Sequence, residues 1–339
     1  MANEMKKAAP FGMKDKVGYM FGDFGNDFTF LLSSSFLMKF YTDVMGVNAA
    51  IVGMVMMIAR FVDAFTDVGM GQIVDHSKPN KDGKFRPWIK RMCGPVAIAS
   101  FLIYQSGLAG MPYGFKVAWL FVTYILWGSI FYTSINIPYG SMASAISSDP
   151  KDRADLSTWR TIGSTLANMV IGVATPMVAY VVVDGKTVMS GSRMTIIAGV
   201  FSICAILCYI VCFKLTSERV EVPASNQKIS ASAIFKSIFT NKALLGIIVA
   251  AIFVLLSQLT VMSLAGYVYP NVYGSAAAQS TASLLGTVVM LVVCAPFASK
   301  LSAKFGKKEL AMGSSIISAL VWLVCLIWRP ASVWGFVAC

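Results

Sequence analysis

The sequence predicts an all-α protein made of membrane-spanning helices. Of its 339 residues, 57% are hydrophobic and 13% are charged, whereas a soluble domain carries roughly 25% charged residues. Apolar stretches follow one another along the chain, and many reach the roughly 20 residues that a bilayer crossing requires. The mean hydropathy of +0.69 agrees with this pattern. We therefore expect a multi-pass membrane protein with its lipid-facing surface on helices.

Nine apolar stretches and the start of a tenth predict the order of the helices. The spans are expected at 17–46, 48–75, 88–110, 116–147, 155–183, 193–214, 242–270, 276–299 and 309–328, with the tenth beginning near Trp334. Several are longer than a bilayer crossing requires, so we expect them to tilt. Short polar segments separate the spans.

A long polar connection after the sixth span divides the chain in two. It covers 216–240 and separates a six-helix half, 1–215, from a second half, 241–339. Basic, glycine-bearing loops follow both the second and the eighth spans, a weak repeat typical of two halves related by duplication. On that logic a complete protein has twelve spans. We therefore expect the second half to be truncated, and a non-functional fragment is one alternative for the chain.

The distribution of Lys and Arg predicts the orientation in the membrane. Of the 28 basic residues, 22 lie at the N-terminus or near the loops after the second, fourth, sixth and eighth spans, and four lie in the alternate loops. Basic loops stay in the cytoplasm, so we expect a cytoplasmic N-terminus in an inner or plasma membrane. The net charge of +12 follows from this loop bias, so it does not indicate a nucleic-acid partner.

Ionisable, amide and hydroxyl side chains interrupt the apolar spans. They are Asp23, Asn26 and Asp27 in the first span, Arg60, Asp63, Thr66 and Asp67 in the second, Thr133 and Asn136 in the fourth, and Arg160 in the fifth. A charge at the centre of a bilayer costs about 2.5–3.5 kcal/mol on insertion scales, and such residues mark ion or substrate pathways. Asp63 and Asp67 are four residues apart and share a helix face. The alternative is a structural ion pair, since Arg60 is close enough to pair with Asp63.

The types of side chain suggest which ligands would bind. Carboxylate, hydroxyl and amide oxygens suit a hard monovalent cation such as Na⁺ or Li⁺. Crowded carboxylates could also take up H⁺. Carboxylates accept hydrogen bonds from the hydroxyls of a polyol and guanidinium groups donate to them. We expect no cofactor, and the cysteines predict neither a metal centre nor a disulfide framework.

These residues lie in strings that resemble a known family. GDFGNDF, FYTDVMG, ARFVDAFTDVGMGQIVD, GKFRPWI, YILWGSIFYTSINIPYGSM and DPKDRADLSTWR occur in the right order over the first half. They resemble the glycoside–pentoside–hexuronide:cation symporters, the melibiose-permease branch of the major facilitator superfamily. The resemblance implies that superfamily's fold, alternating access between two halves, a sugar substrate and a coupling cation.

The resemblance also implies a role for individual residues. Asp63, Asp67 and Thr133 match the cation site, to which we add Thr66 and Asn136. Asp27 and Arg160 match sugar-binding positions, and we place Asn26, Asn136 and Trp127 with them. The resemblance makes Asp63 and Asp67 the metal ligands if the cation is Na⁺.

Three departures from the family pattern bear on the ligands. Asn136 stands where melibiose permease has a carboxylate shared between sugar and cation, Thr66 stands for an asparagine, and Gly140 stands for a tryptophan at the sugar site. The lost carboxylate leaves the choice among Na⁺, Li⁺ and H⁺ open. The lost aromatic ring argues against melibiose as the substrate.

Two other functions compete with a sugar:cation symporter. A lipid or lysolipid carrier can use the same fold, because a fold does not fix its substrate, but it needs fewer polar groups in its cavity. An intramembrane enzyme needs an activated nucleophile, and no G-x-S-x-G or H-E-x-x-H motif occurs in the sequence. We therefore expect a transporter.

Overall fold

The computed structural model describes residues 10–222, 239–294, 297, 301, 304–328, 330 and 332–338, and this part of the chain is almost entirely helical. In the first half the helices are α1 (Met13–Lys39), α2 (Ala49–His76), α3 (Arg86–Ile103), α4 (Tyr113–Ile125), α5 (Thr133–Ile146), α6 (Pro150–Ala179) and α7 (Gly191–Leu215). A π-helical segment, η1 (Phe40–Val44), extends α1, and another, η3 (Leu126–Tyr132), joins α4 and α5 into one continuous helix. A short 3₁₀ turn, η2, covers Ser106–Leu108.

The second half is built in the same way. Its helices are α9 (Lys242–Tyr267), α10 (Ala276–Val289), α12 (Lys307–Trp328) and α13 (Val333–Ala338), with π-helical extensions η4 (Val268–Val272) and η5 (Met290–Cys294). The predicted connection 216–240 lies largely outside the described residues, as do several residues between η5 and α12.

Six helical segments in the described part of the chain are long and apolar enough to cross a membrane. They are α2, α4 to α5, α6, α7, α9 with η4, and α12 from Lys308 on. α1 carries Asp23, Asn26 and Asp27 in its middle, and the 18 residues of α3 include three basic ones, Arg86, Lys90 and Arg91. The nine spans expected from the sequence are thus not all recovered by length and composition, and their number stays a prediction.

The predicted helix 155–183 is wrong at both ends. It begins earlier, at Pro150, because the side chain of Asp149 caps it by accepting a hydrogen bond from the Lys151 N–H at 2.8 Å. It ends at Ala179, where β1 (Tyr180–Val183) pairs antiparallel with β2 (Lys186–Met189). The turn residues Asp184 and Gly185 have φ of 50° and 74°, as a two-residue hairpin requires. The sequence VVVDGKTV, a run of valines followed by Asp-Gly, carries this hairpin signal.

The predicted third span, 88–110, also ends too late. α3 stops at Ile103, and a single 3₁₀ turn leads to α4. Two glycines, Gly107 and Gly110, and Pro112 follow within nine residues of the helix end, and these residues disfavour continuation of a helix.

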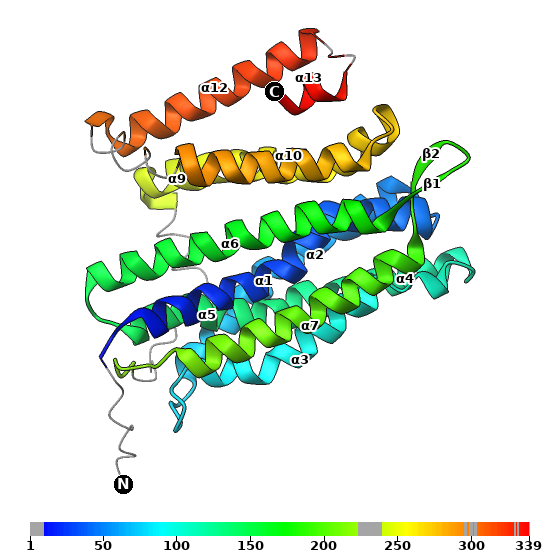
Figure 1. Ribbon diagram of the computed structural model, residues 1–339. Helices are drawn as coiled ribbons and strands as arrows, with labels where there is room; N and C mark the ends of the chain where they lie inside the picture. Colours follow the sequence, from blue (N-terminus) through cyan, green and yellow to red (C-terminus); the bar gives the residue numbers. More distant parts are fainter. Residues whose placement is uncertain are drawn as a thin grey trace.

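α1 is the central helix of the first half. It packs along α6 and α7 and also contacts α9 of the second half (Figure 1). The close approach of α1 to α5 depends on Gly22, because a Cβ atom there would overlap the ring of Tyr139 on α5. Tyr19 stacks on the same ring with centroids 4.6 Å apart. The polar residues of α1 are therefore held deep in the bundle.

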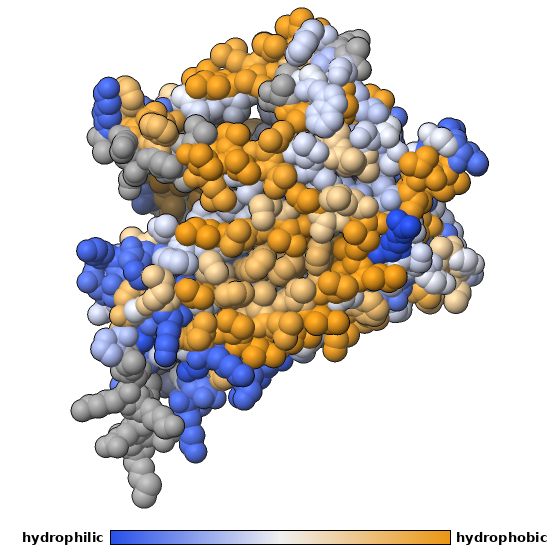
Figure 2. All heavy atoms as spheres, in the orientation of Figure 1, coloured by the Kyte–Doolittle hydropathy of each residue, from blue (hydrophilic) through white to orange (hydrophobic). Residues whose placement is uncertain are grey.

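The two ends of the bundle differ in character. In Figure 2 hydrophobic side chains cover the middle of the visible face and hydrophilic ones gather towards its ends. We call the end where α1 begins and the α2–α3 loop lies the basic end. The opposite end, which carries β1 and β2, is the hairpin end (Figure 1). The predicted orientation puts the basic end in the cytoplasm.

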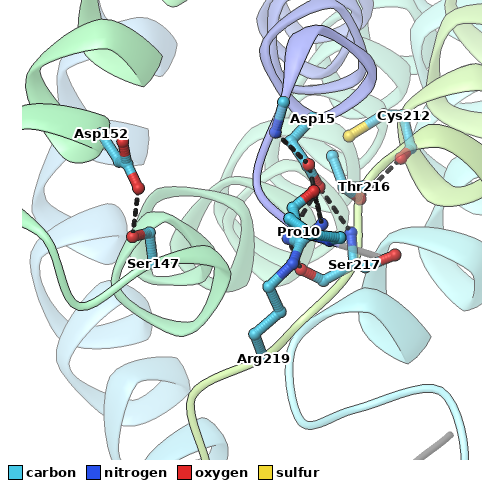
Figure 3. Close-up of polar contacts among 9 residues, drawn as sticks. Pro10, Asp15, Ser147, Asp152, Cys212, Thr216, Ser217 and Arg219 are labelled. Atoms are coloured by element: carbon cyan, nitrogen blue, oxygen red, sulfur yellow. Dashed lines mark hydrogen bonds and ion pairs between the residues drawn. The ribbon is translucent and has the colours of Figure 1, made fainter. Parts of the chain in front are cut away.

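At the basic end, the chain that leaves α7 is tied back onto the first half (Figure 3). Arg219 forms an ion pair with Asp15 at 2.8 Å, and the Ser217 N–H donates to the same carboxylate. Glu218 accepts hydrogen bonds from three successive backbone N–H groups at the start of α3. Such groups have no partner within their own helix, so Glu218 stabilises the start of α3. The contacts of Ser217 and Arg219 with Asp15 fix the end of α7 to α1.

The contacts between the halves include a polar cluster at the hairpin end. Lys39 donates to Asp43 at 2.6 Å and to Asn271 of η4 at 3.2 Å, and its ammonium lies 4.7 Å from the ring centroid of Tyr267. Thr187 of β2 donates to the carbonyl of Gly274. Lys39, which is 1% exposed, thus pairs within the first half and bridges to the second.

Candidate substrate and cation site

Two hydroxyl groups face the two carboxylates of α2. Ser129 Oγ donates to Asp63 Oδ1 at 2.5 Å, and Thr133 Oγ1 donates to Asp67 Oδ1 at 2.8 Å. Asp63 and Asp67 are four residues apart, and so are Ser129 and Thr133, so each helix presents its two groups on one face. Asp67 and Thr133, which were both predicted for the cation site, are thus in contact, and the sequence analysis missed Ser129.

The hydroxyls come from the irregular part of their helix. Ser129 lies within η3 and Thr133 directly follows it. The Thr133 hydroxyl also lies within 3.2 Å of the carbonyl oxygen of Gly128, five residues earlier, which is the reach of a π-helical turn. Such turns are frequent at functional sites, and here the turn positions side chains and carbonyl groups towards α2.

Arg60 partly balances the charge of this pair. Its guanidinium lies 3.1 Å from Asp63 Oδ2 and also donates to the hydroxyl of Tyr124 at 3.4 Å. Asp63 therefore has a partner on each oxygen, whereas the hydrogen-bond donor to Asp67 is the neutral Thr133. One arginine and two carboxylates leave one net negative charge at full ionisation, which is the charge that a single monovalent cation or proton would neutralise.

A cavity of about 260 Å³ opens beside these groups. Its lining includes Arg60, Asp63, Asp67, Trp127, Thr133 and Asn136. The indole Nε1 of Trp127 is buried and has no hydrogen-bond partner among the described residues. Thr66 is not part of the lining, because its hydroxyl donates to backbone carbonyls of its own helix, at Val62 and Asp63. The cavity thus gathers most of the predicted cation ligands and two predicted sugar residues, Trp127 and Asn136, of which Asn136 was predicted for both sites.

Amide groups connect this cavity to α1. Asn26 Nδ2 donates to Asn136 Oδ1 at 3.2 Å, and the Tyr209 hydroxyl donates to Asn26 Oδ1 at 2.9 Å. Asn26 and Tyr209 are both buried. Asn136 therefore lies on the cation cavity and at the same time contacts α1, the helix that carries the predicted sugar residues.

The predicted sugar residues Asp27 and Arg160 do not pair with each other. Arg160 of α6 instead forms an ion pair with Asp23, one turn before Asp27, at 2.8 Å. Its guanidinium also lies 5.5 Å from the ring centroid of Tyr139. Asp27 is 8% exposed, and its Oδ2 has no hydrogen-bond partner among the described residues. A buried carboxylate oxygen of this kind is an acceptor for a ligand hydroxyl.

The structure adds three residues that the sequence analysis did not assign to the site. Ser129 contacts Asp63, Asp23 pairs with Arg160, and Tyr132 lines the cavity. Ser129 had a usable signal, since it precedes Thr133 by the same four residues that separate Asp63 from Asp67. Asp23 also precedes Asp27 by four residues, but nothing in the sequence identified which of the two would meet Arg160.

Known proteins match nearly the whole chain. The MFS/sugar transport protein family matches residues 18–339. The symporter YjmB of Bacillus subtilis (strain 168) is 32% identical over 330 residues, which cover 96% of this chain and 69% of the relative. The glucuronide carrier protein homolog of Escherichia coli (strain K12) is 30% identical over 325 residues, or 94% and 67%. The isoprimeverose transporter of Lactiplantibacillus pentosus is 30% identical over 309 residues, or 91% and 63%. The chain spans about two thirds of the length of these relatives.

Proposed function

The chain belongs to the MFS/sugar transport protein family, and from this premise we propose that it carries a sugar across the membrane together with a monovalent cation. Membership confirms the family resemblance and the fold class predicted from the sequence, and it makes the chain a multi-pass membrane protein of a transporter family. The coupling cation, its site and the transport cycle are parts of the proposal.

The observation that carries the proposal is the paired contact between α2 and the η3 region. Asp63 with Ser129 and Asp67 with Thr133 bring four oxygen-bearing side chains together, and Asp63, Asp67 and Thr133 of these line the cavity. Hard cations prefer carboxylate, hydroxyl and carbonyl oxygens. We assign the cation to this pair, with Asp67 as its main charged ligand because Arg60 already pairs with Asp63.

Asn136 supplies a route for coupling between cation and sugar. It lines the cation cavity, and its amide oxygen accepts a hydrogen bond from Asn26 of α1. A cation that fixes the orientation of Asn136 also fixes its partner Asn26 on α1. Asn26 is the neighbour of Asp27, and we place the sugar at Asp27 and Arg160. Coupling of this kind is reciprocal, so each ligand should raise the affinity for the other by the same factor.

The transport cycle that we propose is rocking of the two halves about a site between them. The contacts of Lys39 with Asn271, Thr187 with Gly274 and the Tyr180 hydroxyl with the Gly266 carbonyl support it. All three cross between the halves near the hairpin end. If the halves break these contacts and form new ones at the basic end, the site opens towards the hairpin end.

Uptake measurements test the proposal directly. Cells or membrane vesicles that contain the carrier should accumulate at least one labelled glycoside, pentoside or hexuronide against its gradient, and accumulation should require Na⁺, Li⁺ or an inward H⁺ gradient. Collapse of that cation gradient should leave only downhill movement. Uptake that is indifferent to all three cations would contradict the coupling, and absence of uptake for every sugar would contradict the substrate class.

A further inference from the structure

A second cavity, separate from the one beside Asp63, lies between the two halves. It measures about 220 Å³ and is lined by residues of α1, α6, α9, η4 and α10. No charged side chain stands in its described lining. Because both halves form its wall, a molecule bound there would contact both moving parts of the carrier.

One wall of this cavity presents an unpaired acceptor. Gln279 of α10 is 5% exposed and lines the cavity, and its Oε1 has no hydrogen-bond partner among the described residues. A buried polar atom without a partner costs about 1–3 kcal/mol. Its neighbour Ser280 donates to the carbonyl of Val173 on α6, so α10 is fixed in a rotation that holds Gln279 at the cavity.

The backbones of α6 and α10 approach each other closely beside the cavity. A Cβ atom at Gly172 of α6 would lie 2.8 Å from Ser283 of α10, so the two helices meet there only because Gly172 has no side chain. This contact brings Ser283 and Asn168 to the cavity with Gln279. Asn168 is exposed although it stands in the middle of α6, so the cavity can be reached on that side.

The chemistry of the lining selects a neutral, hydroxyl-bearing ring. Phe36 and Tyr269 supply aromatic surface, and Gln279, Asn168 and Ser283 supply hydrogen-bonding groups. Apolar walls with a few fixed polar groups are typical of small-molecule sites. An acceptor such as Gln279 Oε1 requires a donor, which a sugar hydroxyl provides. A charged group would enter without a counter-charge, which is unfavourable away from water.

The position of the cavity relates it to the sugar site. Ser35 lies eight residues after Asp27 on α1, and Asn168 lies eight residues after Arg160 on α6. At 1.5 Å per residue both separations are about 12 Å along the helix axes. The two regions are therefore arranged in series along the same pair of helices, towards the hairpin end.

We propose that this cavity is a second subsite that binds the neutral second ring of a two-unit glycoside, with Gln279 as the residue that selects it. The inference rests on the proposed function, because it assumes that the first unit of the solute binds near Asp27 and Arg160. It makes the preferred substrates glycosides of two units rather than free monosaccharides.

Matched pairs of solutes test the subsite. For glucose, galactose, xylose and glucuronic acid, each methyl glycoside is compared with a disaccharide that carries the same sugar at its non-reducing end, as competitors for uptake by the carrier. Gln279→Leu should weaken inhibition by the best disaccharide at least tenfold and change inhibition by its methyl glycoside less than twofold. Gln279→Asn, which retains the amide, should recover part of the loss.

Two further variants keep the test independent of folding. Gln258→Leu makes the same chemical change on an exposed position of α9 outside the cavity, so it should leave both solutes unaffected. Ala282→Phe fills the cavity from α10 and should exclude the disaccharide while the methyl glycoside still competes. Equal losses for both solutes, or no change for either in both cavity variants, would overturn the subsite and leave the proposed function intact. Absence of uptake by the wild-type carrier would overturn both.

Discussion

Ser129 donates a hydrogen bond of 2.5 Å to Asp63 from a different helix, and Thr133 repeats the arrangement with Asp67 four residues further on. The two hydroxyls and two carboxylates thus form two successive contacts between α2 and the continuous helix of η3 and α5. Ser129 is 1% exposed, so water does not replace its hydroxyl readily. The position of Asp63 therefore depends on this serine as well as on Arg60.

Ser129→Ala should weaken cation binding while the carrier still folds. The substitution removes one donor from Asp63, and a hydrogen bond to a charged group contributes about 1.5–3 kcal/mol. We expect the cation concentration for half-maximal uptake to rise about tenfold. Ser134→Ala is the matched control, because the Ser134 hydroxyl donates to the carbonyl of Ile130 in its own helix. An unchanged cation requirement in Ser129→Ala would remove Ser129 from the site.

Asp63→Cys and Asp67→Cys should each abolish cation-driven accumulation. Each change removes a charged ligand from a small site, while downhill exchange of sugar can continue because exchange needs no net cation movement. Accumulation and exchange of the same labelled sugar are the two measurements. Asp184→Asn, in the hairpin turn, is the control, because asparagine tolerates the positive φ of that position. Normal uphill accumulation in both cysteine variants would refute the assignment.

The sequence predicted most helices because each span is a long apolar stretch and depends on local composition alone. The prediction failed where a turn signal lies next to an apolar run, as at Asp184 and Gly185. The three valines before them resemble the end of a membrane span unless the Asp-Gly turn is recognised. The segment that follows Ile103, where α3 ends, is a similar case. Both errors concern element ends, which depend on a few residues.

The candidate site was predictable to the extent that its residues share a face of one helix. The pairs Asp63 with Asp67 and Arg60 with Asp63 follow from spacing, and the latter ion pair is present. Contacts between helices were not predictable in this way. The choice of Asp23 over Asp27 by Arg160 depends on how α1 and α6 are rotated against each other, and the in-helix hydrogen bonds of Thr66 depend on its rotamer.

Arg160→Ala should impair sugar binding more than cation binding. The guanidinium is the strong donor in the predicted sugar region, and its removal also leaves Asp23 without its ion-pair partner. We expect the affinity for sugar to fall at least tenfold and the affinity for the cation less than threefold, both by calorimetry. The double variant Asp23→Asn with Arg160→Gln separates the two effects, since it leaves no unpaired charge. Sugar affinity within twofold of wild type in Arg160→Ala would count against the assignment.

The hairpin should face the outside of the cell. The excess of basic residues at the opposite end predicts this orientation, and Lys186 begins β2 at the hairpin end. In a cysteine-free background, a cysteine at Lys186 should react with a membrane-impermeant maleimide in intact cells. A cysteine at Asn80, in the α2–α3 loop, should react only after the cells are opened. The reverse pattern would place the N-terminus outside.

Lys39→Met should loosen the hairpin end of the carrier. Methionine has a similar length but cannot donate to Asn271 across the interface or pair with Asp43. The contact with Asn271 exists only when the hairpin end is closed, so its loss destabilises the closed state alone. The change should therefore increase the fraction of carriers open at the hairpin end. A cysteine at Ser283, on the cavity between the halves, would report this by faster reaction with an impermeant maleimide added outside. Lys116→Met is the control, because the Lys116 ammonium donates to the carbonyl of Ala109 within the first half. Equal labelling rates for Lys39→Met, Lys116→Met and the parent would mean that the Lys39 contact does not hold the two halves together.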